Sequence, residues 1–160
     1  MVLVFAVSAL AQKEMLTKEE TVNYLNKKLQ EVDGRSMSWP NAFSRYSNLS
    51  FRIKGDNVEL KYVETFQNGT TRQTNYEFNP GHISKFETIH GPQSGSAVRS
   101  FRVKFISKTG RFSDTSTALK DVDYADFPYF AALTDARVRM QKALLHLRDL
   151  AKAEEEPFGN

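Results

Sequence analysis

The sequence predicts an α+β protein in which antiparallel strands lie between a short N-terminal helix and a long C-terminal helix. Apolar residues recur at helical spacing over 18–32 and again over 133–154. Between these segments, apolar and polar residues alternate in runs that are separated by turn residues. No internal repeat or low-complexity linker interrupts the chain, so we expect a single domain over 12–160.

The first eleven residues are apolar and uncharged, end in Ala9-Leu10-Ala11, and are followed by the polar Gln12. This pattern is typical of the second half of a secretory signal peptide. Because no basic residue precedes the apolar run, either the true start lies upstream of Met1 or the signal is unusually short. The alternative is a buried N-terminal strand, since residues 2–7 have β-branched character. We predict a signal peptide over 1–11 and therefore an exported protein, periplasmic or extracellular.

Composition narrows the possible functions. The 22 basic and 19 acidic residues leave a formal net charge of only +3. The chain has no cysteine, which excludes thiol nucleophiles, thiolate metal sites and disulfides. We expect the core to depend on packing of its 12 Phe, 6 Tyr and 1 Trp. No segment reaches the about 20 apolar residues that a transmembrane helix needs.

The first helix begins at a capping box, Thr17-Lys18-Glu19-Glu20, in which the first and last side chains bond each other's backbone amides. Its apolar face carries Val22, Leu25, Leu29 and Val32, and Gly34 supplies the stop.

Alternation predicts six strands. A turn at 55–57 and a type I′ turn at Asn68-Gly69 join the first three strands into hairpins, with Tyr76 and Phe78 facing inward. The acidic and aromatic segment 121–128 is expected to be a loop. The strands are expected at 49–54, 58–66, 70–78, 83–89, 100–105 and 111–119.

The C-terminal helix has an apolar stripe along about 20 residues, or roughly 30 Å, which is long enough to close the open end of a sheet. A frayed tail is expected from about residue 154. The stripe consists of Leu133, Ala136, Met140, Leu144, Leu147 and Ala151.

The sequence contains no recognisable catalytic, cofactor-binding or metal-binding motif. His82, Glu87 and His90 are close in sequence, but the two histidines would be about 26 Å apart along a strand. Residues 121–126 begin like a calcium loop and lack its glycine and its final glutamate. Residues 91–95 are one position out of register with a nucleophile elbow.

Residues 100–105 interleave basic and aromatic side chains, as sheets that bind single-stranded nucleic acid do. The same alternation is explained by aromatics that face the core and basic residues that face water. The segment lacks the glycines of the RNA-recognition signature. We therefore expect no nucleic-acid partner for an exported protein of this kind.

The order of elements resembles the pleckstrin-homology-like fold, in which antiparallel strands are closed by one C-terminal helix. The N-terminal segment 17–29 and the C-terminal segment 143–158 are similar to those of small uncharacterised exported proteins of Gram-negative bacteria. The resemblance implies a barrel or roll of six to seven strands, so a seventh strand is expected near Trp39 or between Leu119 and Phe127. It implies no known activity. Arg52, Lys54 and Lys61 are the nearest equivalent of the basic motif in phosphoinositide-binding members, without its spacing.

We therefore expect a non-catalytic binding module for a protein, peptide or lipid partner, without a cofactor. Arg99, Arg102 and Lys104 are the predicted partner-facing patch. Two alternatives stay open. One is a carrier of a small apolar ligand, with the helix gripping a curved sheet around a cavity. The other is an enzyme in which one of the three histidines, His82, His90 or His146, meets carboxylates.

Overall fold

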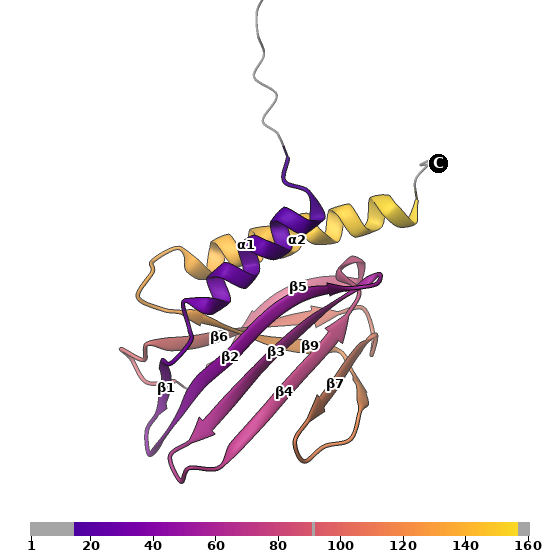
Figure 1. Ribbon diagram of the computed structural model, residues 1–160. Coiled ribbons are helices and arrows are strands. Elements are labelled where there is room, and N and C mark those ends of the chain that lie inside the picture. Colours follow the sequence, from indigo (N-terminus) through magenta and orange to yellow (C-terminus); the bar gives the residue numbers. More distant parts are fainter. Residues whose placement is uncertain (1–14, 91, 157–160) are drawn as a thin grey trace, which may run out of the picture.

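The computed structural model describes residues 15–156 except residue 91, and the predicted signal peptide at 1–11 lies outside these residues. Strands form two layers, and both helices lie across one end of them (Figure 1). The elements are α1 (Lys18–Gln30), β1 (Ser36–Trp39), β2 (Ala42–Lys54), β3 (Asn57–Phe66), β4 (Thr71–Phe78), the 3₁₀ turn η1 (Pro80–His82), β5 (Ile83–Thr88), β6 (Val98–Phe105), β7 (Gly110–Asp114), β8 (Lys120–Val122), β9 (Tyr124–Phe130) and α2 (Ala136–Glu155).

The described strands form two antiparallel sheets and do not close into a barrel. The larger sheet has the order β1-β2-β3-β4-β7-β8, and the smaller has the order β5-β6-β9. The α+β class, the antiparallel pairing and the C-terminal helix are as the sequence predicts. The closed barrel is not observed, because no ladder joins the edges of the two sheets.

The core fills the space between the sheets and beneath the helices. Phe101 and Phe127 stack at 5.7 Å between ring centroids, and Phe78 stacks on Phe105 at 4.7 Å. From α2, Met140 and Leu144 reach the same cluster with no exposed surface. Close packing of this kind is the main source of stability in a protein without disulfides.

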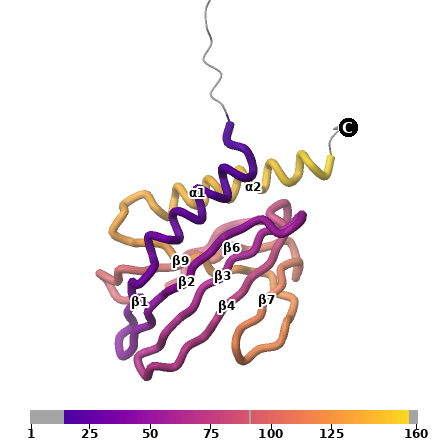
Figure 2. The backbone as a smooth tube through the Cα atoms, viewed as in Figure 1, coloured from indigo at the N-terminus to yellow at the C-terminus, as the bar shows by residue number. Residues whose placement is uncertain are grey.

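The first helix starts as predicted. Thr17 Oγ1 accepts a hydrogen bond from the Glu20 amide at 3.2 Å, and the Thr17 amide donates to the Glu20 carboxylate at 2.8 Å. The helix ends at Gln30, two residues before the predicted end, and Gly34 follows with a φ of 73°. Figure 2 shows α1 and α2 crossing over the same end of the strands.

The long C-terminal helix begins at Ala136, three residues later than predicted, and Leu133 stays 41% exposed. The helix ends at Glu155, one residue beyond the predicted start of a frayed tail at about 154. Glu154 is paired with Lys18 at 2.7 Å, and Glu155 accepts from Asn79 at 2.9 Å, so the last turn is fixed to other elements.

Two strand predictions need correction. The segment predicted as an acidic loop at 121–128 contains most of β9, an edge strand that pairs with β6. Its Ala125 and Phe127 are fully buried. Only the first part of the predicted strand at 111–119 is a strand, β7, and β8 follows the predicted range at Lys120–Val122. The strand β1 forms near Trp39, one of the two places where a seventh strand is expected. Within the described residues neither helix is long and apolar enough to span a membrane.

Candidate ligand-binding cleft

The three histidines are not brought together. His82 lies in η1, His90 follows β5, and the Nε2 atom of His146 on α2 is 2.6 Å from the carbonyl oxygen of Leu16. Glu87, the residue between the first two in sequence, pairs with Lys85 at 2.8 Å. Across residues 15–156, leaving out residue 91, no group of three His, Cys, Asp or Glu side chains is placed to hold a metal ion.

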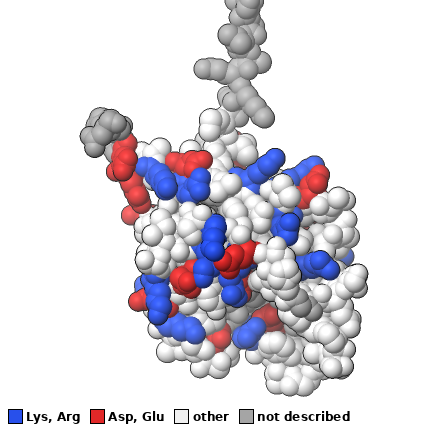
Figure 3. Space-filling model, turned by 180° about the vertical axis from the view of Figure 1, so that it is seen from behind, with Lys and Arg blue, Asp and Glu red and all other residues white. Residues whose placement is uncertain are grey.

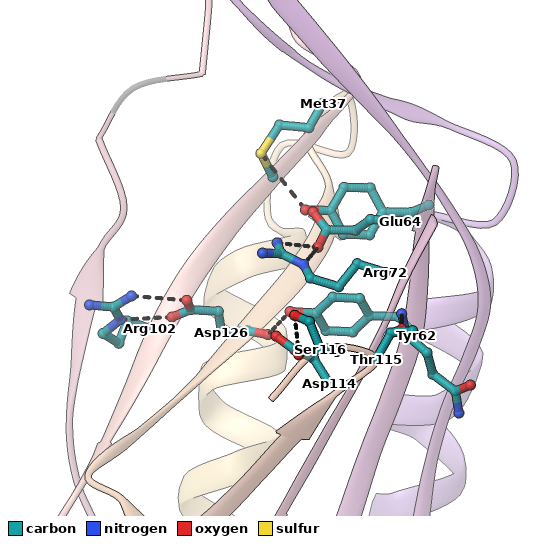
Figure 4. Close-up of polar contacts among 11 residues, drawn as sticks. Met37, Tyr62, Glu64, Arg72, Arg102, Asp114, Thr115, Ser116 and Asp126 are labelled. Carbon is teal, nitrogen blue, oxygen red and sulfur yellow. Dashed lines mark hydrogen bonds and ion pairs between the residues drawn. The ribbon is translucent and has the colours of Figure 1, made fainter. Parts of the chain in front are cut away.

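A cleft of about 260 Å³ opens between the inner face of the larger sheet and β9 of the smaller sheet. Side chains from the two sheets point toward one another there (Figure 4). Four of the lining residues are tyrosines, and we call this site the tyrosine cleft. It is lined by Met37, Trp39, Tyr46, Tyr62, Glu64, Arg72, Thr74, Tyr76, Ile89, Phe112, Tyr124 and Asp126.

The first charged pair in the cleft is Glu64 with Arg72. These residues lie directly opposite each other on β3 and β4, so cross-strand geometry places them in contact. Arg72 donates to one carboxylate oxygen through Nη2 at 2.6 Å and Nε at 3.1 Å. The Glu64 side chain is only 7% exposed. Burial lowers the pKa of Arg72, but the Glu64 carboxylate outweighs it and the pKa is raised.

The second pair is Asp126 with Arg102, which face each other on β9 and β6. The pair is bidentate, with N···O distances of 2.7 and 2.9 Å, the geometry that makes such pairs strong. The hydrogen bond to Asp126 raises the pKa of Arg102. The guanidinium also lies 4.0 Å from the centre of the Tyr124 ring. Figure 4 shows this pair on the side of the cleft opposite Glu64.

The tyrosines form most of the wall. Tyr46 and Tyr62 lie 5.5 Å apart between ring centroids, and Tyr76 lies 6.2 Å from Tyr124. Burial, followed by nearby negative charge and neighbouring tyrosines, raises the pKa of Tyr46, Tyr62 and Tyr76. These hydroxyls therefore stay protonated. Tyr46 donates to Met37 Sδ at 3.9 Å and Tyr62 donates to the carbonyl oxygen of Asp126 at 3.5 Å, so their oxygens are left as acceptors.

The chemistry of the cleft is that of a neutral, aromatic and hydrogen-bonding surface. Both carboxylates are already matched by guanidinium groups, so neither is free to neutralise a charged ligand. The volume lies just below the roughly 300–1,000 Å³ of sites that enclose a drug-sized molecule. The cleft suits one ring-sized group with an apolar face and a polar edge.

The predicted patch of Arg99, Arg102 and Lys104 does not form one surface. Successive residues of a strand face opposite sides, so Arg102 and Lys104 share one face of β6 and Arg99 lies on the other. Lys104 is paired with Asp123, as Arg102 is with Asp126. Arg99 is exposed and has no ion pair among the described residues.

The three basic residues that most resemble the phosphoinositide-binding motif are also paired with acidic residues. Arg52, Lys61 and Lys54 surround Glu59 at 2.6, 2.9 and 3.6 Å, and the Glu59 side chain is 3% exposed. Lys54 also reaches Glu77 at 2.6 Å. Seen from behind, the surface shows acidic and basic side chains intermixed across its centre (Figure 3). This mixture gives no broad one-sign patch on that face.

Sequence reasoning missed the residues of the tyrosine cleft for two local reasons. A bulge at Ser47–Ser50, where Asn48 has a φ of 53°, lets both Tyr46 and Leu49 point inward despite their odd spacing. The hairpin between β3 and β4 has a three-residue loop in place of the predicted type I′ turn, since Gly69 alone has a positive φ there. This loop sets the register that puts Glu64 opposite Arg72. One sequence signal could have predicted this register: Glu64 and Arg72 have opposite charges and lie on either side of Asn68-Gly69.

Comparison of the chain with family models, with curated proteins and with solved structures finds no match in any of the three.

Proposed function

We propose that this protein is a non-catalytic binding module and that the tyrosine cleft receives one uncharged side chain of a protein or peptide partner. The proposal rests on one observation, which is that both acidic side chains in the cleft are neutralised by arginines. The two carboxylates, Glu64 and Asp126, are each hydrogen-bonded to an arginine. What remains for a ligand is a set of aromatic rings and hydroxyl groups.

The pairings support binding over catalysis. A general acid or base needs a proton that it can exchange near the working pH. Here the charged form of each arginine is stabilised, and burial keeps the tyrosines protonated. These are properties of a rigid recognition surface.

The lining supports a peptide side chain over a lipid. A lipid headgroup with a phosphate calls for cations that are free to pair with it, whereas the arginines of the cleft already have acids. A carrier of an apolar ligand needs space beneath the helix. That space holds Phe78, Leu144 and Leu147, which are at most 1% exposed.

Two further expectations belong to the same proposal. The order of elements, with antiparallel sheets and a C-terminal helix, supports a pleckstrin-homology-like origin for the fold. The apolar run before Gln12 supports export, with cleavage after Ala11. The first helix starts at Lys18, beyond that cleavage point.

The single tryptophan makes the proposal testable, because Trp39 lines the cleft. N-acetyl-phenylalaninamide carries one uncharged ring and does not absorb where tryptophan is excited. We expect it to change Trp39 fluorescence with a Kd on the order of 1 mM, the range for so small a ligand. The N-acetyl amides of glutamate and lysine should bind much more weakly.

A matched pair of variants separates the cleft from the rest of the surface. Phe112 lines the cleft on β7, and Phe86 is an equally half-buried phenylalanine on β5 outside it. Phe112→Ala should weaken binding of the probe about fivefold, the value of one aromatic contact, and Phe86→Ala should not. Equal binding by the two variants, or preference for either charged probe, would contradict the proposed function.

A further inference from the structure

A second, larger groove lies at the start of α2 and does not include any residue of the tyrosine cleft. Its volume is about 610 Å³. It is bounded by the 95–97 segment before β6, the end of β9, and the first turn of α2. We call it the arginine groove; its lining is Gly95, Ser96, Ala97, Arg99, Tyr129, Phe130, Ala131, Ala132, Leu133, Thr134, Arg137 and Val138.

The charged residues of this lining are both arginines, and no acidic residue is among the described residues that line it. Arg99 comes from β6 and is exposed, whereas Arg137 comes from α2 and donates to Thr88 Oγ1 at 3.2 Å. Neither takes part in an ion pair within the described part of the chain. This contrasts with Arg72 and Arg102, which are both paired.

A third cation lies at the edge of the groove. The Arg35 guanidinium stacks over the Phe130 ring at 3.8 Å from its centre. Arg35 donates to the backbone carbonyl of Glu31 at 2.7 Å and so is held in place without an acid of its own. The nearest pairing on α2 joins Asp135 to Arg139 at 3.6 Å, with both side chains about 65% exposed.

Besides the cations, the groove presents apolar side chains together with Ser96 and Thr134. Leu133 and Val138 are 41% and 44% exposed, and Tyr129 and Phe130 are half-buried against the core. A ligand must therefore offer carboxylates at separated points and apolar groups between them. An extended acidic peptide has this chemistry, and each carboxylate can pair bidentately with a guanidinium.

We propose that the arginine groove is a docking site for an acidic, partly apolar segment of a partner protein, with Arg99 and Arg137 as the anchors. A flat anionic membrane fits the concave surface less well. Single-stranded nucleic acid needs exposed rings for its bases to stack on. Here the ring of Phe130 is covered by Arg35 on one side and packed on the core on the other.

The test is fluorescence anisotropy with a labelled peptide of alternating glutamate and leucine, compared with the same peptide carrying glutamine for glutamate. We expect the acidic peptide to bind and the glutamine peptide to bind at least tenfold more weakly. Arg99→Gln and Arg137→Gln should each weaken the acidic peptide about tenfold, the value of one charge-assisted hydrogen-bonded contact.

Arg111→Gln is the matched control, because Arg111 is an exposed arginine on β7 outside the groove. It removes the same charge and should leave peptide affinity within about twofold. Equal weakening by all three variants would mean a general charge effect and would overturn the proposal. So would tighter binding of a thymidine oligonucleotide or of phosphatidylglycerol vesicles than of the peptide. Because the Phe112→Ala variant leaves this groove intact, a failure of the tyrosine cleft would not affect the result.

Discussion

At the scale of single residues, charge on the sheets is matched across neighbouring strands. Glu64 faces Arg72, Asp126 faces Arg102, and Glu59 lies among three cations. Opposite charges on facing positions stabilise a sheet, and a buried carboxylate needs such partners. Several residues that look like free charges in the sequence are therefore used within the fold, whereas Arg99 and Arg137 have no ion pair among the described residues.

Gly110 is a residue whose small size the packing requires. A Cβ there would lie 2.5 Å from Cε2 of Phe105, which is 4% exposed and stacked on Phe78. We expect Gly110→Ala to lower the free energy of unfolding by about 1–3 kcal/mol, the cost of overpacking a core, as measured by urea denaturation.

A second substitution identifies the cause. In Phe105→Leu the smaller side chain leaves room for the new methyl group, so the double variant should be more stable than the sum of the two single effects. Strict additivity would show that the contact with Phe105 is not what excludes alanine.

At the scale of elements, the helices and the sheet alternation follow from the sequence because they depend on local periodicity. The capping box and the buried stripe of α2 are confirmed. The segment 121–128 is predicted as a loop because its acidic residues suggest exposure to solvent. Asp123, just before β9, and Asp126, within it, pair with Lys104 and Arg102, which is a tertiary effect that periodicity does not contain.

The two helices offer a matched test of capping. Thr17 accepts from the Glu20 amide, whereas Asp135 at the start of α2 makes no side-chain cap hydrogen bond. Thr17→Ala should lower the free energy of unfolding by about 1 kcal/mol. Asp135→Ala should change it by less than about 0.5 kcal/mol, because its pair with Arg139 is exposed. The reverse order in urea denaturation would contradict this assignment of the caps.

At the scale of the whole molecule, the tyrosine cleft forms where the inner face of the larger sheet meets β9 of the smaller sheet. Its residues come from six strands and from Ile89 after β5, and their meeting depends on a bulge, a hairpin loop and the packing of one sheet on the other. A sequence pattern describes one strand at a time, so it predicts the inward face of each but not which ends meet. The fold class could be predicted from the sequence and the site could not.

The stability of the whole domain should fall in acid. Burial raises the pKa of Glu59, but Lys61 and Arg52 outweigh it and hold that pKa below its usual value of 4.5. Lys54 likewise lowers the pKa of Glu77. A carboxyl whose pKa is lower in the folded state stabilises the protein above its unfolded pKa, and this stability is lost as the pH falls through the folded value.

We therefore expect urea denaturation to show constant stability down to about pH 5 and a steady loss below it. Glu59→Gln should have a shallower loss, because it removes one of the groups responsible. Stability that rises between about pH 5 and pH 3 would contradict the role of these pairs.

The proposed export has its own direct check. If residues 1–11 are a signal peptide, the protein recovered from the exporting cell should begin at Gln12. N-terminal sequencing decides this, and a chain that still begins at Met1 would contradict export and remove the main reason to set nucleic acid aside.

The central proposal is that the tyrosine cleft is the recognition site, and a nuclear magnetic resonance titration tests it most directly. With N-acetyl-phenylalaninamide as the probe, the unique indole N–H signal of Trp39 and the amides around Tyr62 and Phe112 should shift together with one Kd. Shifts that are confined to the helices, or no shifts in the cleft at saturating probe, would contradict it.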